Sequence, residues 1–242
     1  MSYLAIARKW RPHRFEDLVG QGHVVQTLKN AITFERTAHA YLFCGARGVG
    51  KTSVARIFAK ALRCPNAKDA TPCNQCTECQ LISESRSVDV VEIDGASNNG
   101  VEAVRNIRDN VAYGAASGKY KIYIIDEVHM LTKEAFNALL KTLEEPPPHV
   151  IFIMATTEAH KIPQTILSRC QRFDFRRVPS RQIADHLARI CAAENIAAAP
   201  EALWLIARRS DGSLRDSQSL LDQVITFCDG ELTTEKIGDV LG

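Results

Sequence analysis

The residues with the clearest chemical pattern lie in the segment GARGVGKT, which matches G-x-x-x-x-G-K-[ST] in full. Its glycines allow a tight turn whose backbone N–H groups point at phosphate oxygens. Lys51 adds a mobile positive charge, and the Thr52 hydroxyl suits Mg²⁺. A strand-like run precedes the segment and a helix-like run follows it, so the segment predicts a nucleotide-binding loop. The loop residues are Gly45, Gly48, Val49, Gly50, Lys51 and Thr52.

A pair of acids follows the apolar run that ends at Ile125. At the end of a strand, Asp126 would hold Mg²⁺ directly or through water, and Glu127 would polarise the attacking water as the general base. The alternative is a solvated acidic pair. It is disfavoured because strands buried on both faces seldom end in two adjacent carboxylates without a use for them. Nucleotide binding alone does not require Glu127, so the pattern favours hydrolysis.

Four of the eight cysteines are clustered with the spacing C-x₈-C-x₂-C-x₂-C. Two successive C-x₂-C steps bring three thiolates close together, and the first cysteine can complete a tetrahedron around zinc. An iron–sulfur cluster is the alternative. Four protein ligands leave no open coordination position, so the metal is expected to be structural. The predicted ligands are Cys64, Cys73, Cys76 and Cys79.

Apolar runs without polar alternation predict strands buried on both faces. They cover 40–44, 88–93, 121–126 and 150–155, with a short fifth at 173–175. Helical spacing alternates with them at 53–62, 101–111 and 133–145, so an α/β fold with a mostly parallel five-stranded sheet is expected. The crossover from the first strand to the second is too long, which places an insertion around the cysteines of 64–79.

The pattern changes near residue 179, after which the strand-like runs stop. Amphipathic helices are expected at 180–196, 200–210, 213–227 and 233–241. We therefore predict a nucleotide-binding domain over 1–178 and a small all-helical lid domain over 179–242.

Composition limits the classes of function. The net charge is +2, from 30 Lys plus Arg against 28 Asp plus Glu, so bulk electrostatics give no sign of nucleic-acid binding. The sequence has no apolar stretch of the length that a membrane span needs, and its N-terminus has the wrong order of charge for a signal peptide. We therefore expect no membrane association and a cytoplasmic location.

Several motifs together resemble the AAA+ ATPases of bacterial DNA polymerase III clamp loaders, in the order typical of the gamma/tau subunits. They are RPHRFEDLVGQ, GARGVGKTS, IDEVHML, LLKTLEEPP, IFIMATT, ILSRC and GSLRDSQSL. The resemblance covers essentially the whole chain and implies an AAA+ fold with a zinc-binding insertion and a helical lid. It also implies that Ser53 belongs to the phosphate-binding loop, and that an adenine pocket is formed by Ala7, Arg11, Pro12 and Val19.

The same resemblance assigns three residues outside the loop. Thr157 would be a sensor of the γ-phosphate or the attacking water, with Thr156 as a neighbouring candidate. Arg215, on the lid, would be a second sensor in the same chain. Arg169, in the ILSRC motif, resembles an arginine finger that completes the site of a neighbouring subunit. Reasoning from the residues alone leaves open whether Arg169 acts on its own site or a neighbour's.

The resemblance implies an ATP-hydrolysing motor subunit of the DNA polymerase holoenzyme that loads a sliding clamp onto primed DNA. Its partners would be the other subunits of a hetero-pentamer held by a helical collar domain. The 242 residues contain no segment that reads as this collar, so the chain is expected to bind nucleotide but assemble poorly. The alternatives are another AAA+ DNA motor of the branch-migration helicase type, or a nucleotide-gated scaffold without catalysis.

Overall fold

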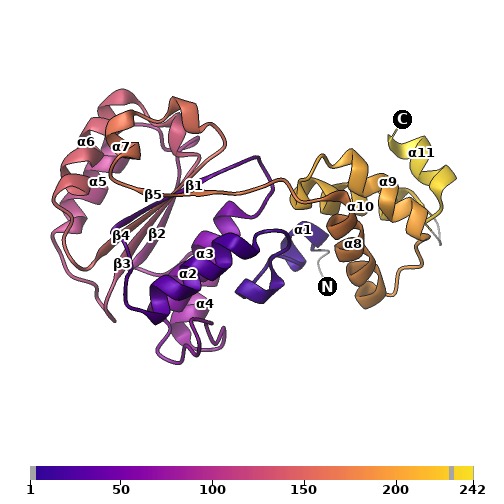
Figure 1. Ribbon diagram of the computed structural model, residues 1–242, viewed down its shortest axis with the longest axis horizontal. Helices are drawn as coiled ribbons and strands as arrows, with labels where there is room; N and C mark the ends of the chain where they lie inside the picture. The colour runs from indigo at the N-terminus through magenta and orange to yellow at the C-terminus, as the bar shows by residue number, and fades with distance from the viewer. Residues whose placement is uncertain (1–3, 229–231, 242) are drawn as a thin grey trace.

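The computed structural model describes residues 4–228 and 232–241. A sheet of five parallel strands in the order β2-β3-β4-β1-β5 forms its centre (Figure 1). The strands are β1 (Ala40–Cys44), β2 (Val90–Asp94), β3 (Lys121–Asp126), β4 (Val150–Thr156) and β5 (Gln171–Asp174). The predicted α/β class and the five strands are confirmed. β2 begins at Val90 and not at Val88 as predicted, and Val88 is 73% exposed.

Helices cover both faces of the sheet (Figure 1). They are α2 (Gly22–Thr33), α3 (Lys51–Arg63) and α4 (Thr77–Ser83), and on the other side α5 (Val101–Val111), α6 (Lys133–Glu144) and α7 (Gln164–Leu167). Short 3₁₀ helices are η1 (Phe15–Asp17), η2 (Val128–Met130) and η3 (Ala159–Lys161). Successive side chains of β1 enter different cores, Tyr41 and Phe43 on the α3 side and Leu42 on the α6 side, because side chains alternate along a strand.

A separate helical lid follows the sheet. It consists of α8 (Ser180–Glu194), α9 (Pro200–Arg209), α10 (Leu214–Phe227) and α11 (Thr234–Leu241), which agree closely with the predicted helices. Its core is distinct from the two cores of the sheet.

The N-terminal helix α1 (Ile6–Lys9) packs against this lid, although its position in the sequence suggests the first domain. Ile6 is buried in the lid core, and its backbone N–H donates to Asp222 Oδ2 at 2.8 Å. The Trp10 ring N–H donates to Glu194 Oε1 at 2.8 Å. Phe15, later in the same segment, is buried in the core on the α3 side of the sheet. Residues 5–19, here called the N-terminal arm, therefore tie the lid to the sheet domain.

Within the described residues, none of the helices combines the length and apolar character needed to cross a bilayer.

Candidate active site

A cavity of about 1040 Å³ lies where the glycine-rich loop, the ends of β3 and β4, the N-terminal arm and the lid meet. Almost all of the predicted nucleotide-site residues line it. They are Ala7, Arg11, Pro12, Val19, Gly48, Val49, Gly50, Lys51, Thr52, Ser53, Asp126, Glu127, Thr157 and Arg215. Gly45, also predicted for the site, is not among the described lining residues, but its carbonyl accepts from the Lys51 ammonium. Five separate segments of the chain thus converge on one space.

The glycine-rich loop has the backbone conformation that its sequence predicts. Gly50 has φ +105° and is the N-cap of α3, whose first three residues, 51–53, line the cavity. The Lys51 ammonium donates to the carbonyls of Gly45 and Ala46, both at 2.8 Å. Burial lowers the pKa of Lys51, and the carboxylates of Glu127 and Asp126 oppose this. The ammonium is therefore held inside the loop and ready to contact an anion.

The lid touches the loop directly at Gly48. A Cβ at this position would lie 2.0 Å from Ser213 Oγ and 3.2 Å from Arg215 Cβ. The Arg215 N–H donates to the Gly48 carbonyl at 3.3 Å. The Ser213 hydroxyl also caps α10 by accepting from the Asp216 N–H at 3.2 Å. The glycine is required for the close approach of α10, which brings Arg215 to the cavity.

Gly48→Ala is expected to destabilise this contact. The residue has φ +75°, which costs a non-glycine residue about 1–2 kcal/mol. Moving Ser213 away would also cost about 0.5–2 kcal/mol of capping. We expect a fall in the free energy of unfolding of roughly this sum and weaker nucleotide binding, measured by chemical denaturation and by titration with a fluorescent nucleotide. Gly22→Ala, where a Cβ meets nothing within 4 Å, is the matched control. Equal effects of the two substitutions would contradict the lid contact.

The two acids at the end of β3, Asp126 and Glu127, differ in backbone conformation and in hydrogen-bond partners, and both line the cavity. The Thr52 hydroxyl donates to Asp126 Oδ2 at 2.6 Å, so the two predicted magnesium ligands lie side by side. Glu127 adopts the left-handed conformation, with φ 45° and ψ 46°, which is uncommon for a residue other than glycine. This conformation turns the chain sharply after Asp126 and leaves both carboxylates on the cavity.

Thr157, and not Thr156, reaches the predicted general base. The Thr157 hydroxyl donates to Glu127 Oε2 at 3.0 Å, and its N–H donates to the same oxygen at 3.3 Å. Thr156 is fully buried, and its hydroxyl lies 3.1 Å from His129 Nδ1. Thr156 is the last residue of β4 and points into the core, whereas Thr157 follows the strand and reaches the cavity.

Arg11 lies in the N-terminal arm beside the loop. Burial is the largest cause that lowers the pKa of its guanidinium, followed by repulsion from Arg56 and opposed by attraction to Glu92. Arg56 itself is paired with Glu92 at 2.7 Å. The arm therefore places a partly desolvated cation at the rim of the cavity.

Arg169 lies outside the cavity, at the end of α7. Its guanidinium pairs with Glu144 Oε1 at 2.7 Å and donates to the Thr165 carbonyl, also at 2.7 Å. Its side chain is 32% exposed. The described residues that line the cavity do not include it. The side chain is thus fixed on the surface, away from the loop of its own chain.

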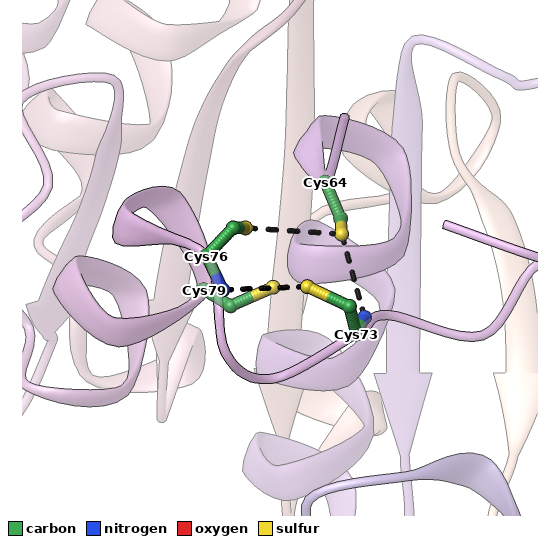
Figure 2. Close-up of side chains that lie close together, drawn as sticks. All are labelled: Cys64, Cys73, Cys76 and Cys79. Carbon is green, nitrogen blue, oxygen red and sulfur yellow. Dashed lines mark hydrogen bonds between the residues drawn. The ribbon is translucent and has the colours of Figure 1, made fainter. Parts of the chain in front are cut away.

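The four clustered cysteines converge at the end of α3 and the start of α4 (Figure 2). Their sulfur atoms all lie within 4.8 Å of one another, and those of Cys64 and Cys76 are 3.9 Å apart. Tetrahedral zinc with Zn–S bonds of about 2.3 Å implies S–S distances of ~3.8 Å. The cluster therefore fits a four-coordinate zinc ion.

Hydrogen bonds already favour the thiolate at one of these cysteines. The backbone N–H groups of Gln75 and Cys76 lower the pKa of Cys73 to about 6. The insertion is also anchored to the sheet, because the buried Arg63 binds both Glu78 of α4 at 2.7 Å and Asp89 at 2.8 Å.

Two histidines that are not among the residues predicted for the site also line the cavity, His129 and His186. His186 Nε2 lies 3.1 Å from Gln218 Nε2 within the lid. His129 follows Glu127 by two residues, and this short separation was the available signal. Neither histidine has ligand-like spacing, and it is the folded chain that brings them to the site.

Two family models match this chain. The model of the family described as "DNA polymerase III, delta subunit" matches residues 20–179. The family described as "DNA polymerase III clamp loader subunit, ATPase lid domain" matches residues 182–230.

Relatives that are similar over the whole chain carry related names. DNA polymerase III subunit tau of Bacillus subtilis is 55% identical over 97% of this chain, and that of Escherichia coli is 52% identical over the full chain. The chain spans only 42% and 38% of these two relatives. DNA polymerase III subunit gamma of Buchnera aphidicola subsp. Acyrthosiphon pisum is 44% identical, and the chain covers 67% of it.

Among solved structures, the RuvB Holliday junction branch migration motor of Thermotoga maritima aligns with a TM-score of 0.72. The alignment covers 96% of this chain and 72% of that one, at 18% identity, so the likeness is one of fold. Together with the match to the ATPase lid family, this confirms the AAA+ fold with a helical lid. The chain belongs to the family of tau and gamma subunits of bacterial DNA polymerase III.

Proposed function

We propose that this chain is the ATP-binding and ATP-hydrolysing part of a clamp-loader subunit. With other clamp-loader subunits it would place the sliding clamp on primed DNA. The observation that carries the proposal is the single cavity in which a complete phosphate-binding loop meets an acidic pair, Thr157 and a lid arginine. The names of the relatives and of the lid family support the assignment to a clamp loader.

Nucleotide binding would divide between two segments. The adenine would lie against the N-terminal arm, at Ala7, Arg11, Pro12 and Val19. The phosphates would lie in the glycine-rich loop, whose backbone N–H groups and Lys51 ammonium carry the positive charge they need. Ile6 of the same arm is buried in the lid core. The segment that would contact the adenine would therefore also influence the position of the lid.

Thr52 and Asp126 would hold Mg²⁺, and their contact at 2.6 Å supplies the oxygen ligands this ion prefers. When bound, the ion would neutralise charge on the phosphate oxygens. Glu127 would accept a proton from the attacking water. Thr157, bonded to Glu127, would orient that carboxylate and the water next to it. Arg215 of the lid would contact the γ-phosphate, so the position of the lid would depend on whether ATP or ADP is bound.

The test is the rate of ATP hydrolysis by the full-length subunit, assembled with its partner subunits, in the presence and absence of sliding clamp and primed DNA. We expect the rate to rise when both are added and to be lost in Lys51→Ala, which also loses nucleotide binding. Nucleotide binding without turnover would indicate a scaffold. Stimulation by a four-way junction, but not by clamp and primed DNA, would indicate a branch-migration motor.

We also propose that the insertion holds a structural zinc ion through Cys64, Cys73, Cys76 and Cys79. Zinc would join the end of α3 to α4 and order a segment with little apolar surface of its own. The site would have no catalytic role, because four thiolates fill the tetrahedral coordination shell.

Cys76→Ser is expected to lower zinc affinity by at least about 100-fold, more than the loss of an outer-shell partner causes. Metal content after dialysis against a mild chelator, measured by mass spectrometry, checks this. Cys228→Ser, in the lid, should keep its zinc. Bound iron with visible absorbance in the unmodified protein would instead favour the iron–sulfur alternative.

A further inference from the structure

His129 lies at the junction of three elements beside the predicted general base. It belongs to η2, and its side chain is only 5% exposed while lining the cavity. Nδ1 is 3.4 Å from Glu127 Oε2 and 3.1 Å from the Thr156 hydroxyl. Nε2, on the other side of the ring, is 3.2 Å from Glu158 Oε1. One imidazole therefore stands between two carboxylates from different parts of the chain.

The partners of this ring are mainly hydrogen-bond acceptors. Carboxylates accept only, and the Thr156 oxygen already accepts from the Glu158 N–H at 3.0 Å. A neutral imidazole has one N–H and can satisfy one carboxylate, whereas the imidazolium donates to both. The ring donates to Glu127 through Nδ1 and to Glu158 through Nε2 at the same time only as the imidazolium. Glu158 is itself held by Lys161 at 2.9 Å.

The contacts to Glu127 are concentrated on one oxygen. Within the part of the chain that the structure describes, the Thr157 hydroxyl, the Thr157 N–H and His129 Nδ1 all approach Oε2. With Oε2 held by these groups, Oε1 is the oxygen left to take the proton of water. A general base works only when the accepting atom lies within hydrogen-bond reach of that proton.

We propose that His129 is a positioning residue that, oriented by Glu158, holds the Glu127 carboxylate through Oε2 and leaves Oε1 for the water. The inference rests on the proposed function of the site. A misplacement of about 1 Å in a catalytic group can cost about 10²-fold in rate, which sets the scale of the effect. Because the ring touches the base and not the predicted phosphate ligands, its loss should lower kcat and leave KM for ATP unchanged.

Two substitutions of His129 test the contributions of its two ring nitrogens separately. In His129→Asn the amide nitrogen takes the place of Nδ1, and in His129→Gln it takes the place of Nε2. In the full-length, assembled subunit we expect His129→Gln to lower kcat by about 10- to 100-fold and His129→Asn to retain much of it. ATP affinity and thermal unfolding should match those of the unmodified protein in both variants. His160→Gln is the control, since His160 is 75% exposed and approaches Glu158 at 3.7 Å without reaching Glu127.

The double variant that combines His129→Gln with Glu127→Gln tests whether His129 acts through Glu127. If His129 acts through Glu127, adding His129→Gln to Glu127→Gln should lower the residual rate no further. An unchanged kcat in His129→Gln, alongside a large loss in Glu127→Gln, would overturn the inference and leave the proposed function standing. Equal losses in the Asn and Gln variants with lowered unfolding temperatures would show a packing role instead. An unmodified subunit that binds ATP without turnover would overturn both proposals.

Discussion

Arg169→Ala is expected to lower ATP hydrolysis by about 10³- to 10⁵-fold at each shared site, without weakening ATP binding by the chain that carries it. The guanidinium is fixed on the surface by Glu144, outside the cavity that contains its own loop. In the transition state, charge spreads over phosphate oxygens that Lys51 alone does not neutralise. An arginine supplied by an adjacent subunit would make hydrolysis depend on assembly.

The measurement is the ATPase rate per subunit over a range of protein concentrations. The unmodified protein should become faster as concentration rises, and Arg169→Ala should stay flat. A mixture of Arg169→Ala with Lys51→Ala provides the sharper result. Where the intact loop of the first subunit faces the intact Arg169 of the second, a complete site forms and activity should return. Activity that does not return, together with a concentration-independent rate in the unmodified protein, would place Arg169 in its own site.

Glu127→Gln is expected to leave ATP binding intact and to lower hydrolysis by about 10²- to 10⁴-fold. Glutamine keeps the size of the side chain and an oxygen that accepts from Thr157, but it has no basic oxygen for the water proton. Binding should persist because Lys51, Thr52 and Asp126 are unchanged.

Single-turnover hydrolysis and nucleotide titration, measured on the same preparation, check this prediction. Glu134→Gln, at an exposed carboxylate in the first turn of α6, should behave as the unmodified protein. Turnover that survives in Glu127→Gln would mean that another group activates the water. Loss of binding as well as turnover would mean that the substitution disturbs the loop.

Two short-range arrangements expected from the sequence are present in the structure, the tight glycine-rich turn and the group of four cysteines. The conformation of the glycine-rich loop follows from its own residues, since positive φ at Gly48 and Gly50 is available at little cost only to glycine. The four cysteines are close together because two C-x₂-C steps and one helix end require it. The long helices after β1 were also predicted well, because their apolar periodicity extends over several turns. The 12-residue helix α2 was not predicted, and its buried side chains are only Val24 and Leu28. The helices missed include α1 and α7, which have four residues each and so carry no period.

The sequence by itself determined the chemistry available to this protein: a phosphate-binding loop, an acidic pair at a strand end, and a cluster of four thiols. Only the tertiary structure decided which side chains meet. It brings Thr157 rather than Thr156 to Glu127, places Ser213 against Gly48, buries Ile6 in the lid, and sets His129 between two carboxylates. The physical reason is range. Neighbouring residues constrain one another through backbone geometry, whereas most of these contacts join segments far apart in the chain. They depend on how strands and helices pack and on the left-handed turn at Glu127.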